Sequence, residues 1–262
     1  MFRIFGLDIQ DISLAEILLK IREAIAVNKQ MLIVTANPEI LVYSQKSKKY
    51  YEILKKAILL PDGIGIVLAS LFGRHFIKNG RVRGVDLVQE LVKNSANLGY
   101  SVYIIGTSSN DILQKATQNF SSTYGKINII GYDSGPNFDK KAEFPLNNVE
   151  NDKLLTILQQ LKPDVLLVAF GHPKQEFWLD YYLPQLPVKI GIGVGGTFDY
   201  LAGVVKSPPL MFKRLGLEWF WRLIIQPARI KRIFTAVIVF PCLFGGYLIK
   251  KLFHVEQLDK NG

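Results

Sequence analysis

The sequence has only one cysteine and three histidines among its 262 residues, and this scarcity excludes several kinds of site. Cys242 alone cannot form a disulfide framework, a cysteine-based zinc site or a CxxC redox motif. His75, His172 and His254 lie far apart in the chain, so a histidine-rich metal site is not expected. The sequence also has no DxD pair near the expected strand ends, so we expect no bound metal there. No cofactor is expected either.

The beginning of the chain, MFRIFGLDIQDIS, lacks the apolar core of a signal peptide and carries acidic side chains. We therefore expect a protein of the cytosol. Apolar residues make up 49% of the chain, which is enough for a sizeable core and excludes intrinsic disorder.

Acidic residues are scarce in the last quarter of the chain. Residues 1–203 contain 22 basic and 19 acidic side chains, whereas residues 204–262 contain 10 basic and 3 acidic ones. Most of the net charge of +10 therefore lies in one region, which is expected to meet an anion or an anionic surface. We divide the chain into a core, residues 1–203, and an appendage, residues 204–262.

The core alternates short apolar runs with helical patterns. Strands are expected at residues 31–35, 57–60, 101–105, 127–130, 164–170 and 188–192, and helices at 38–49, 64–71, 85–96, after Gly106 and at 174–182. This repeated strand–turn–helix order predicts an α/β fold: a mostly parallel sheet with helices on both faces. Residues 133–150 are polar and contain glycine and proline, which predicts a surface loop.

The appendage shows helical patterns without strands and contains an apolar stretch, Ile233–Ile249, of 17 uncharged residues. A helix of this length spans about 25 Å, whereas the hydrocarbon core of a bilayer is about 30 Å thick. Pro241 and Gly245–Gly246 also interrupt the stretch. We interpret it as a segment that lies in, or dips into, a membrane interface. A full span and an ordinary buried helix remain the alternatives.

Ligands of open parallel sheets bind beyond the carboxyl ends of the strands. The segments expected there supply glycines, hydroxyls, amides, a lysine and aspartates, which suit a phosphorylated or sugar ligand. They are TANPE (35–39), PDGIG (61–65), GTSSN (106–110), GHPKQE (171–176) and GVGGTFD (193–199).

Asp62 is the strongest single candidate for a functional residue, because it stands between Pro61 and Gly63 at a strand end. It is either a general base for a hydroxyl nucleophile or a helix cap. Thr35 and Asn37 either bind a sugar or order their turn. Asp199 either holds a sugar hydroxyl or caps a helix.

The segment Gly191–Gly196 matches the pattern GxGxxG. A dinucleotide fingerprint should open a βαβ unit, but no strand pattern follows here. We therefore do not expect a nicotinamide or flavin site.

Arg222, Arg229 and Arg232 are spaced by seven and three residues, so on a continuous helix they would share one face. Pro227 either kinks this helix or stands at the start of a new one. Beside an apolar aromatic segment, this face suits a diphosphate at a membrane surface. A solvated basic face or unspecific attraction to anionic lipid are the alternatives. Nucleic acid is less favoured as a partner, because the neighbouring segment is apolar rather than a polar aromatic groove.

Six motifs occur in the order of a known family. TANPEILV, PDGIGIV, RVRGVDL, AFGHPKQE, GVGGTFDYLAG and GLEWFWRLIIQPARIKR resemble the successive motifs of the WecG/TagA/CpsF bacterial glycosyltransferases, glycosyltransferase family 26. The resemblance covers about residues 3–235. It implies a Rossmann-like core, homo-oligomers in some members and a C-terminal appendage that reaches the membrane and closes the site.

The resemblance also implies an activity: inverting transfer of a sugar from a UDP-sugar to a membrane-anchored acceptor. The best-known members transfer N-acetylmannosamine, or its uronic acid, to N-acetylglucosaminyl-diphosphoundecaprenol, in the synthesis of cell-surface polysaccharides such as teichoic acid. The expected location is the cytoplasmic face of the cell membrane, with peripheral attachment. A non-catalytic protein that binds sugar nucleotides or lipids is the alternative.

Carried over by motif, the family's catalytic residues fall on Asp62 and Thr35. The expected substrate-binding residues are Asn37, Arg81, Gln175, Asp199, Gly195 and Gly196. The arginines for the acceptor or donor diphosphate are Arg222, Arg229 and Arg232. Two features differ from the family's usual pattern: His172 stands where small or polar residues are common, and a long apolar tail follows Arg232. The donor sugar and the pathway stay open.

Overall fold

The computed structural model describes residues 1–73, 75–106, 109–138 and 149–259, with residues 213–214 and 252–259 described by their backbone alone. The chain forms one eight-stranded sheet with the strand order β1-β2-β4-β3-β8-β7-β5-β6. The strands are β1 (Phe2–Ile4), β2 (Leu7–Ile9), β3 (Met31–Ala36), β4 (Ile58–Pro61), β5 (Val102–Ile105), β6 (Ile129–Asp133), β7 (Val165–Val168) and β8 (Ile190–Gly193). All neighbouring strands are parallel except β1 and β2.

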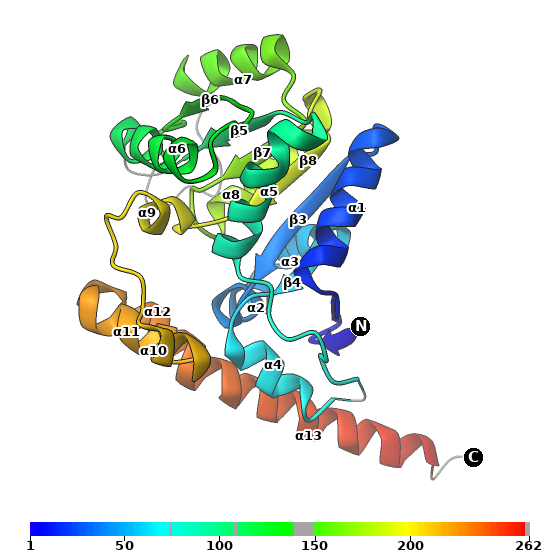
Figure 1. The fold of residues 1–262 in the computed structure, drawn as a ribbon. Helices are drawn as coiled ribbons and strands as arrows, with labels where there is room; N and C mark the ends of the chain where they lie inside the picture. Colours follow the sequence, from blue (N-terminus) through cyan, green and yellow to red (C-terminus); the bar gives the residue numbers. More distant parts are fainter. Residues whose placement is uncertain (74, 107–108, 139–148, 260–262) are drawn as a thin grey trace.

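Helices cover both faces of the sheet (Figure 1). The helices of the core are α1 (Leu14–Ala26), α2 (Pro38–Ser44), α3 (Lys48–Lys56), α4 (Ile64–Ser70), α5 (Gly84–Leu98), α6 (Asn110–Tyr124), α7 (Val149–Leu161), α8 (Lys174–Tyr182), the short η1 (Leu183–Gln185) and α9 (Thr197–Leu201). Helices α1, α5, α6 and α9 pack on one face, and α2, α3, α7 and α8 pack on the other. The predicted α/β class with a mostly parallel sheet is confirmed.

Alternation along the strands explains the two layers. In β5 and β7, successive residues belong to opposite apolar clusters: Ile104 and Leu167 face one layer, and Ile105 and Val168 face the other. Strands buried on both faces read as continuous apolar runs, and this is why all six predicted strands are found, with their ends shifted by at most three residues.

Several expectations about individual elements are wrong. The helix expected at residues 38–49 is two helices, because α2 ends at Ser44 and Ser47 caps a new helix, α3. The antiparallel hairpin β1–β2 was not expected, and its strands have three residues each. Of the loop expected at residues 133–150, residues 134–138 are irregular and α7 begins at Val149, whereas residues 139–148 lie outside the described residues.

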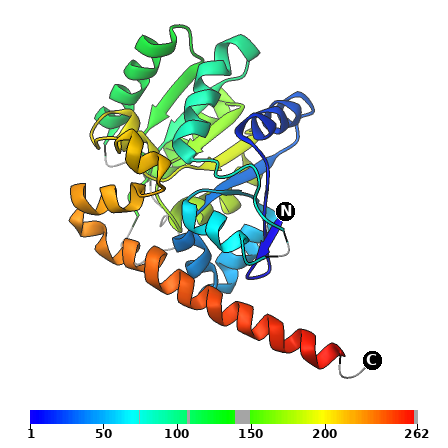
Figure 2. The ribbon, with the colours of Figure 1, turned by 60° about the horizontal axis from the view of Figure 1, so that its bottom comes forward.

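In the described part of the appendage all regular elements are helical, and the appendage lies at the carboxyl-end edge of the sheet (Figures 1 and 2). Its elements are α10 (Leu210–Arg214), α11 (Glu218–Ile225), the 3₁₀ turn η2 (Pro227–Arg229), α12 (Ile230–Phe234), the π-helical turn η3 (Thr235–Val239) and α13 (Phe240–Asp259). From η2 onward they form one long helix, which we call the C-terminal helix. Its segment Pro227–Lys251 is long and apolar enough to cross a membrane by length and composition.

One side of the C-terminal helix packs on the core. Phe240 and Phe244 are buried beside Phe5, with ring centroids 6.3 and 6.5 Å from that of Phe5. Only 11% of the apolar window is buried, however, so the helix is not an ordinary core helix. The exposed apolar side chains on it are Ile230, Phe234, Ile238, Leu243 and Ile249.

We predict that Phe240→Ala loosens the C-terminal helix without unfolding the core. Loss of a buried phenylalanine ring removes about 3 kcal/mol of packing, which corresponds to roughly 100-fold faster local opening. Hydrogen exchange should therefore accelerate in Pro227–Lys251 and stay unchanged in α5. The control is Ile249→Ala, whose side chain on the same helix is 55% exposed. Equal acceleration in both variants would contradict the packing role of Phe240.

Candidate functional site

A cavity of about 780 Å³ lies beyond the carboxyl ends of β3, β4 and β8, between the core and the appendage. This volume is typical of small-molecule sites. Helices that follow β3 and β8 pack on opposite faces of the sheet, so the cavity lies at the switch point where ligands of such sheets bind. The cavity brings together ten of the predicted site residues: Thr35, Asn37, Asp62, Arg81, Gln175, Gly195, Gly196, Arg222, Arg229 and Arg232.

Asp62 follows the last residue of β4. Its backbone N–H donates to the carbonyl oxygen of Ala36 at 2.7 Å, which fixes the turn beside the end of β3. The helix α4 begins after Gly63, whose φ of +110° favours glycine, and no side chain caps this helix. The structure therefore does not support a cap role for Asp62.

The carboxylate of Asp62 has an unusual environment. Burial raises its pKa to about 6. In this net value, the charge of Glu218 also acts to raise the pKa, whereas Arg222, Arg81 and a hydrogen bond from the backbone N–H of Gly84 act to lower it. A carboxyl group with this pKa can exchange a proton near neutral pH, as a general base must.

Thr35 and Asn37 stand on either side of the end of β3. Thr35 Oγ1 donates to the carbonyl oxygen of Gly193 at 3.2 Å and so links β3 to β8. Asn37 caps α2, because its Oδ1 accepts from the backbone N–H of Ile40 at 3.1 Å, with Pro38 in the first turn as expected. Both side chains order their turn, and both line the cavity.

Gln175 is buried and holds two loops together. Its Oε1 accepts hydrogen bonds from the backbone N–H groups of Gly171 and Gly195, at 3.2 and 2.9 Å. Its Nε2 donates to Glu176 Oε1 at 2.7 Å. A Cβ atom at Gly193 would lie 2.7 Å from Gln175 Nε2, so a side chain there would displace Gln175. Gln175 thus fixes the glycine turn of residues 195–196 from beneath.

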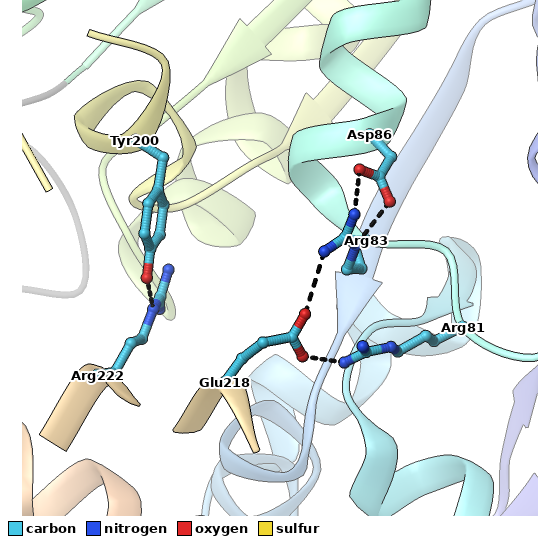
Figure 3. A network of polar contacts seen from close by, with 6 residues as sticks. All are labelled: Arg81, Arg83, Asp86, Tyr200, Glu218 and Arg222. Carbon is cyan, nitrogen blue, oxygen red and sulfur yellow. Dashed lines mark hydrogen bonds and ion pairs between the residues drawn. The ribbon is translucent and has the colours of Figure 1, made fainter. Parts of the chain in front are cut away.

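Glu218, on α11, connects the appendage to two arginines of the core (Figure 3). It pairs with Arg81 and, at 3.1 Å, with Arg83. Arg83 is also held by Asp86 through two hydrogen bonds of 2.6 Å. Both Arg81 and Arg83 line the cavity.

The three arginines of the appendage do not share one helix face, because the helix is not continuous at Pro227. The helix breaks at Gln226, whose φ of −130° and ψ of 73° are not helical, and Pro227 starts the next turn. Arg222 therefore lies on α11, whereas Arg229 and Arg232 lie on η2 and α12. The turn between these elements, rather than a helical repeat, brings the three side chains to one cavity.

The partners of these arginines differ. Arg222 donates to the hydroxyl of Tyr200 (Figure 3), and Arg232 donates to Glu39 Oε2 at 2.6 Å. Arg229 has no carboxylate within hydrogen-bond distance among the described residues. Burial lowers its pKa, as do the positive charges of Arg222 and Arg232. An anion between these side chains would relieve that repulsion.

Glu39 contacts both His172 of the core and Arg232 of the appendage. Burial alone would raise the pKa of Glu39, but its hydrogen bond with His172 Nε2, at 3.1 Å, and the charge of Arg232 lower it to about 2. Glu39 therefore stays ionised and holds Arg232 in position.

Asp199 lies in a neighbouring cavity of about 690 Å³, lined also by Gly195, Gly196, Arg229 and Arg232. Burial raises the pKa of Asp199, against the charges of Arg229 and Arg222. Asp199 lies inside the first turn of α9 and does not cap this helix. The two cavities thus meet at the glycine turn and the appendage arginines.

The segment Gly191–Gly196 does not open a βαβ unit, since only helices follow β8 in the described part of the chain. Among the described residues, no group of three or more His, Cys, Asp or Glu side chains is arranged to hold a metal ion.

The sequence model of the family described as "Glycosyl transferase WecG/TagA/CpsF family" matches residues 2–254. This chain belongs to that family. A relative from Bacillus subtilis (strain 168) is 33% identical over 204 residues, which cover 77% of this chain and 74% of the relative. A relative from Staphylococcus aureus (strain MRSA252) is 28% identical over 236 residues, which cover 88% of this chain and 87% of the relative. Both are named N-acetylglucosaminyldiphosphoundecaprenol N-acetyl-beta-D-mannosaminyltransferase.

The sequence analysis did not identify three polar residues of the cavity that contact its predicted arginines. Glu218, Glu39 and Tyr200 contact Arg81, Arg232 and Arg222 respectively. All three stand inside the family motifs GLEWFWR, TANPE and GTFDYLAG, so the motifs contained a signal. Their partners, however, lie 22 to 193 residues away in the chain.

We predict that Asp62→Asn stabilises the protein, and more so at pH 8 than at pH 5. The raised pKa of Asp62 means that its protonated form favours folding at low pH, and this contribution is lost as the pH rises through about 6. At pH 8 the neutral amide should therefore gain about 3 kcal/mol, or roughly 8 °C in Tm. Thermal unfolding at both pH values measures this.

The control for this prediction is Asp8→Asn on the exposed surface. It should show no comparable difference between the two pH values. An Asp62→Asn variant with the same small, pH-independent effect would show that the Asp62 pKa is not raised.

Proposed function

We propose that this protein is an inverting glycosyltransferase that moves N-acetylmannosamine, or its uronic acid, from a UDP-sugar to N-acetylglucosamine linked to a polyprenyl diphosphate. The observation that carries the proposal is one cavity that holds both a carboxylate of pKa about 6, Asp62, and the arginines Arg222, Arg229 and Arg232. The names of the relatives support the same acceptor and sugar.

In the proposed reaction, Asp62 accepts the proton of an acceptor hydroxyl. The hydroxyl oxygen then attacks the anomeric carbon of the donor, and UDP leaves from the opposite face with the electrons of the broken bond. The proton on Asp62 passes to solvent after the transfer. A pKa of about 6 suits this role, because the carboxylate is ionised at neutral pH and still basic enough to take the proton.

Arginines and backbone N–H groups would stabilise the negative charge of the leaving UDP. The donor diphosphate fits the glycine turn, Gly195–Gly196, where Arg229 lines both cavities. Asp199 in the second cavity would then hold a hydroxyl of the nucleoside. Arg81 and Asn37 would bind the sugars near Asp62, with Thr35 in the reacting centre. Arg232 and Arg222 would meet the acceptor diphosphate.

We further propose that the appendage, residues 204–262, attaches the core peripherally to the inner face of the cell membrane. The C-terminal helix packs on the core along one side, through Phe240 and Phe244, and exposes Phe234, Ile238 and Ile249. A helix with one side on protein and apolar side chains in solvent suits a position in the membrane interface better than a full span.

The test is release of UDP from a panel of UDP-sugars, with and without a short-chain polyprenyl-diphosphate N-acetylglucosamine acceptor, in the presence of EDTA. Acceptor-dependent release with one donor is expected. Asp62→Asn should lower kcat by 10²- to 10⁴-fold, the typical contribution of a general base, while the variant stays folded. Full activity of Asp62→Asn would remove Asp62 from the mechanism, and no release with any donor would overturn the proposed reaction.

The pH dependence of kcat/KM offers a second test. Activity should fall as the pH decreases through about 6, because protonated Asp62 cannot accept a proton. Glu218 raises the pKa of Asp62, so Glu218→Gln should move this acid limb to lower pH by roughly 0.5 unit or more. Asp86→Asn, in the same ion-pair network, is the control and should leave the limb in place. An unmoved limb in Glu218→Gln would contradict the charge coupling.

A further inference from the structure

The main cavity continues from its polar part into an apolar groove between α4 and the C-terminal helix. One wall consists of Ile64, Leu68 and Phe72, which are spaced by four residues along α4 and the turn after it. The other wall is an apolar stripe of the C-terminal helix: Ile233, Ala236, Val237, Phe240, Pro241 and Phe244. Both views of the molecule show α4 beside this helix (Figures 1 and 2).

Contacts between core and appendage hold the two walls in place. A Cβ atom at Gly216, in the turn before α11, would lie 2.9 Å from Ile64 Cγ1, so this turn rests directly on α4. A Cβ atom at Gly65 would lie 4.0 Å from Phe240 Cε1, so the ring of Phe240 reaches the first turn of α4. These two contacts fix α4, the turn before α11 and the C-terminal helix relative to one another.

The exposure of the α4 wall indicates that something covers it. Leu68 is 51% exposed and Phe72 is 70% exposed, although both are large apolar side chains that line the cavity. Exposed apolar surface that continues a ligand cavity is typical of a binding site rather than of ordinary surface.

Charge changes abruptly along this cavity. Arg232 lines the polar part, and the next residue, Ile233, begins the apolar stripe. Trp219, which also lines the cavity, lies on the same helix as Arg222. One end of the cavity thus suits a diphosphate and the other end suits hydrocarbon, which is the pattern of a single amphiphilic ligand.

We propose that the groove between α4 and the C-terminal helix binds the first isoprene units of the acceptor's polyprenyl chain. This inference rests on the proposed function, since it places the tail of the same acceptor whose diphosphate meets Arg232. The protein then recognises the lipid chain itself and does not rely on the membrane alone to present the sugar.

The experiment is calorimetric titration of the full chain, at one fixed detergent concentration, with farnesyl diphosphate and with inorganic diphosphate. Farnesyl diphosphate should bind at least tenfold more tightly. In the double variant Leu68→Gln/Phe72→Gln this advantage should shrink at least tenfold, while the affinity for inorganic diphosphate stays unchanged. Equal affinity of the unaltered chain for both probes would overturn the proposal.

Leu71→Gln is the matched control. Leu71 is 58% exposed and adjoins Phe72, but it does not line the cavity. The Leu71→Gln variant should bind farnesyl diphosphate as tightly as the unaltered chain does. An equal loss in Leu71→Gln and in the double variant would show a general apolar surface for membrane contact and no groove.

The same probes separate this inference from the proposed function. Tighter binding of farnesyl diphosphate without sugar transfer to any acceptor would keep the groove and overturn the reaction. Transfer with equal kcat/KM to acceptors with and without a prenyl chain would keep the reaction and overturn the groove.

Discussion

The ionisation of Asp62 depends on charges from two distant parts of the chain. Burial at the end of β4 raises the pKa of this carboxyl group, as desolvation always does for an acid. The largest compensation comes from Arg222, and a further increase comes from Glu218, both on α11 of the appendage. The core alone would therefore hold Asp62 in a different electrostatic environment. Under the proposed mechanism, the appendage sets the basicity of the catalytic group as well as closing the cavity.

Carboxylates of both the appendage and the core hold the arginines of the cavity in place before any ligand arrives. Glu218 holds Arg81, and Glu39 holds Arg232 together with His172. A guanidinium without a partner in such a site would be costly, whereas a paired one is placed in advance. A diphosphate that binds there must compete with carboxylates, so its affinity depends on how many oxygens it offers to each arginine. Arg229, repelled by Arg222 and Arg232, gains most from such a ligand.

The sequence predicts the core well because its signals are local. Continuous apolar runs identify six of the eight strands, and the glycine turns and Asp62 follow from their positions at strand ends. The hairpin β1–β2 is missed because strands of three residues show no clear period. The prediction of a single helix at residues 38–49 is wrong because Ser47 caps a second helix. A capping serine is a weaker sequence signal than the apolar pattern around it. Ion pairs of Glu39 and Glu218 could not be predicted, since they join residues 193 and 137 positions apart.

The C-terminal helix shows why composition alone does not decide how a segment meets a membrane. By length and apolar content, Pro227–Lys251 passes for a membrane span. A span surrounded by lipid would need every side of the helix to be available, yet Phe240 and Phe244 are packed against Phe5. Only the remaining sides, with Phe234, Ile238 and Ile249, are open. If those sides enter the interface, the groove beside α4 lies where the proposed polyprenyl chain would leave the bilayer, with its diphosphate end toward Arg232.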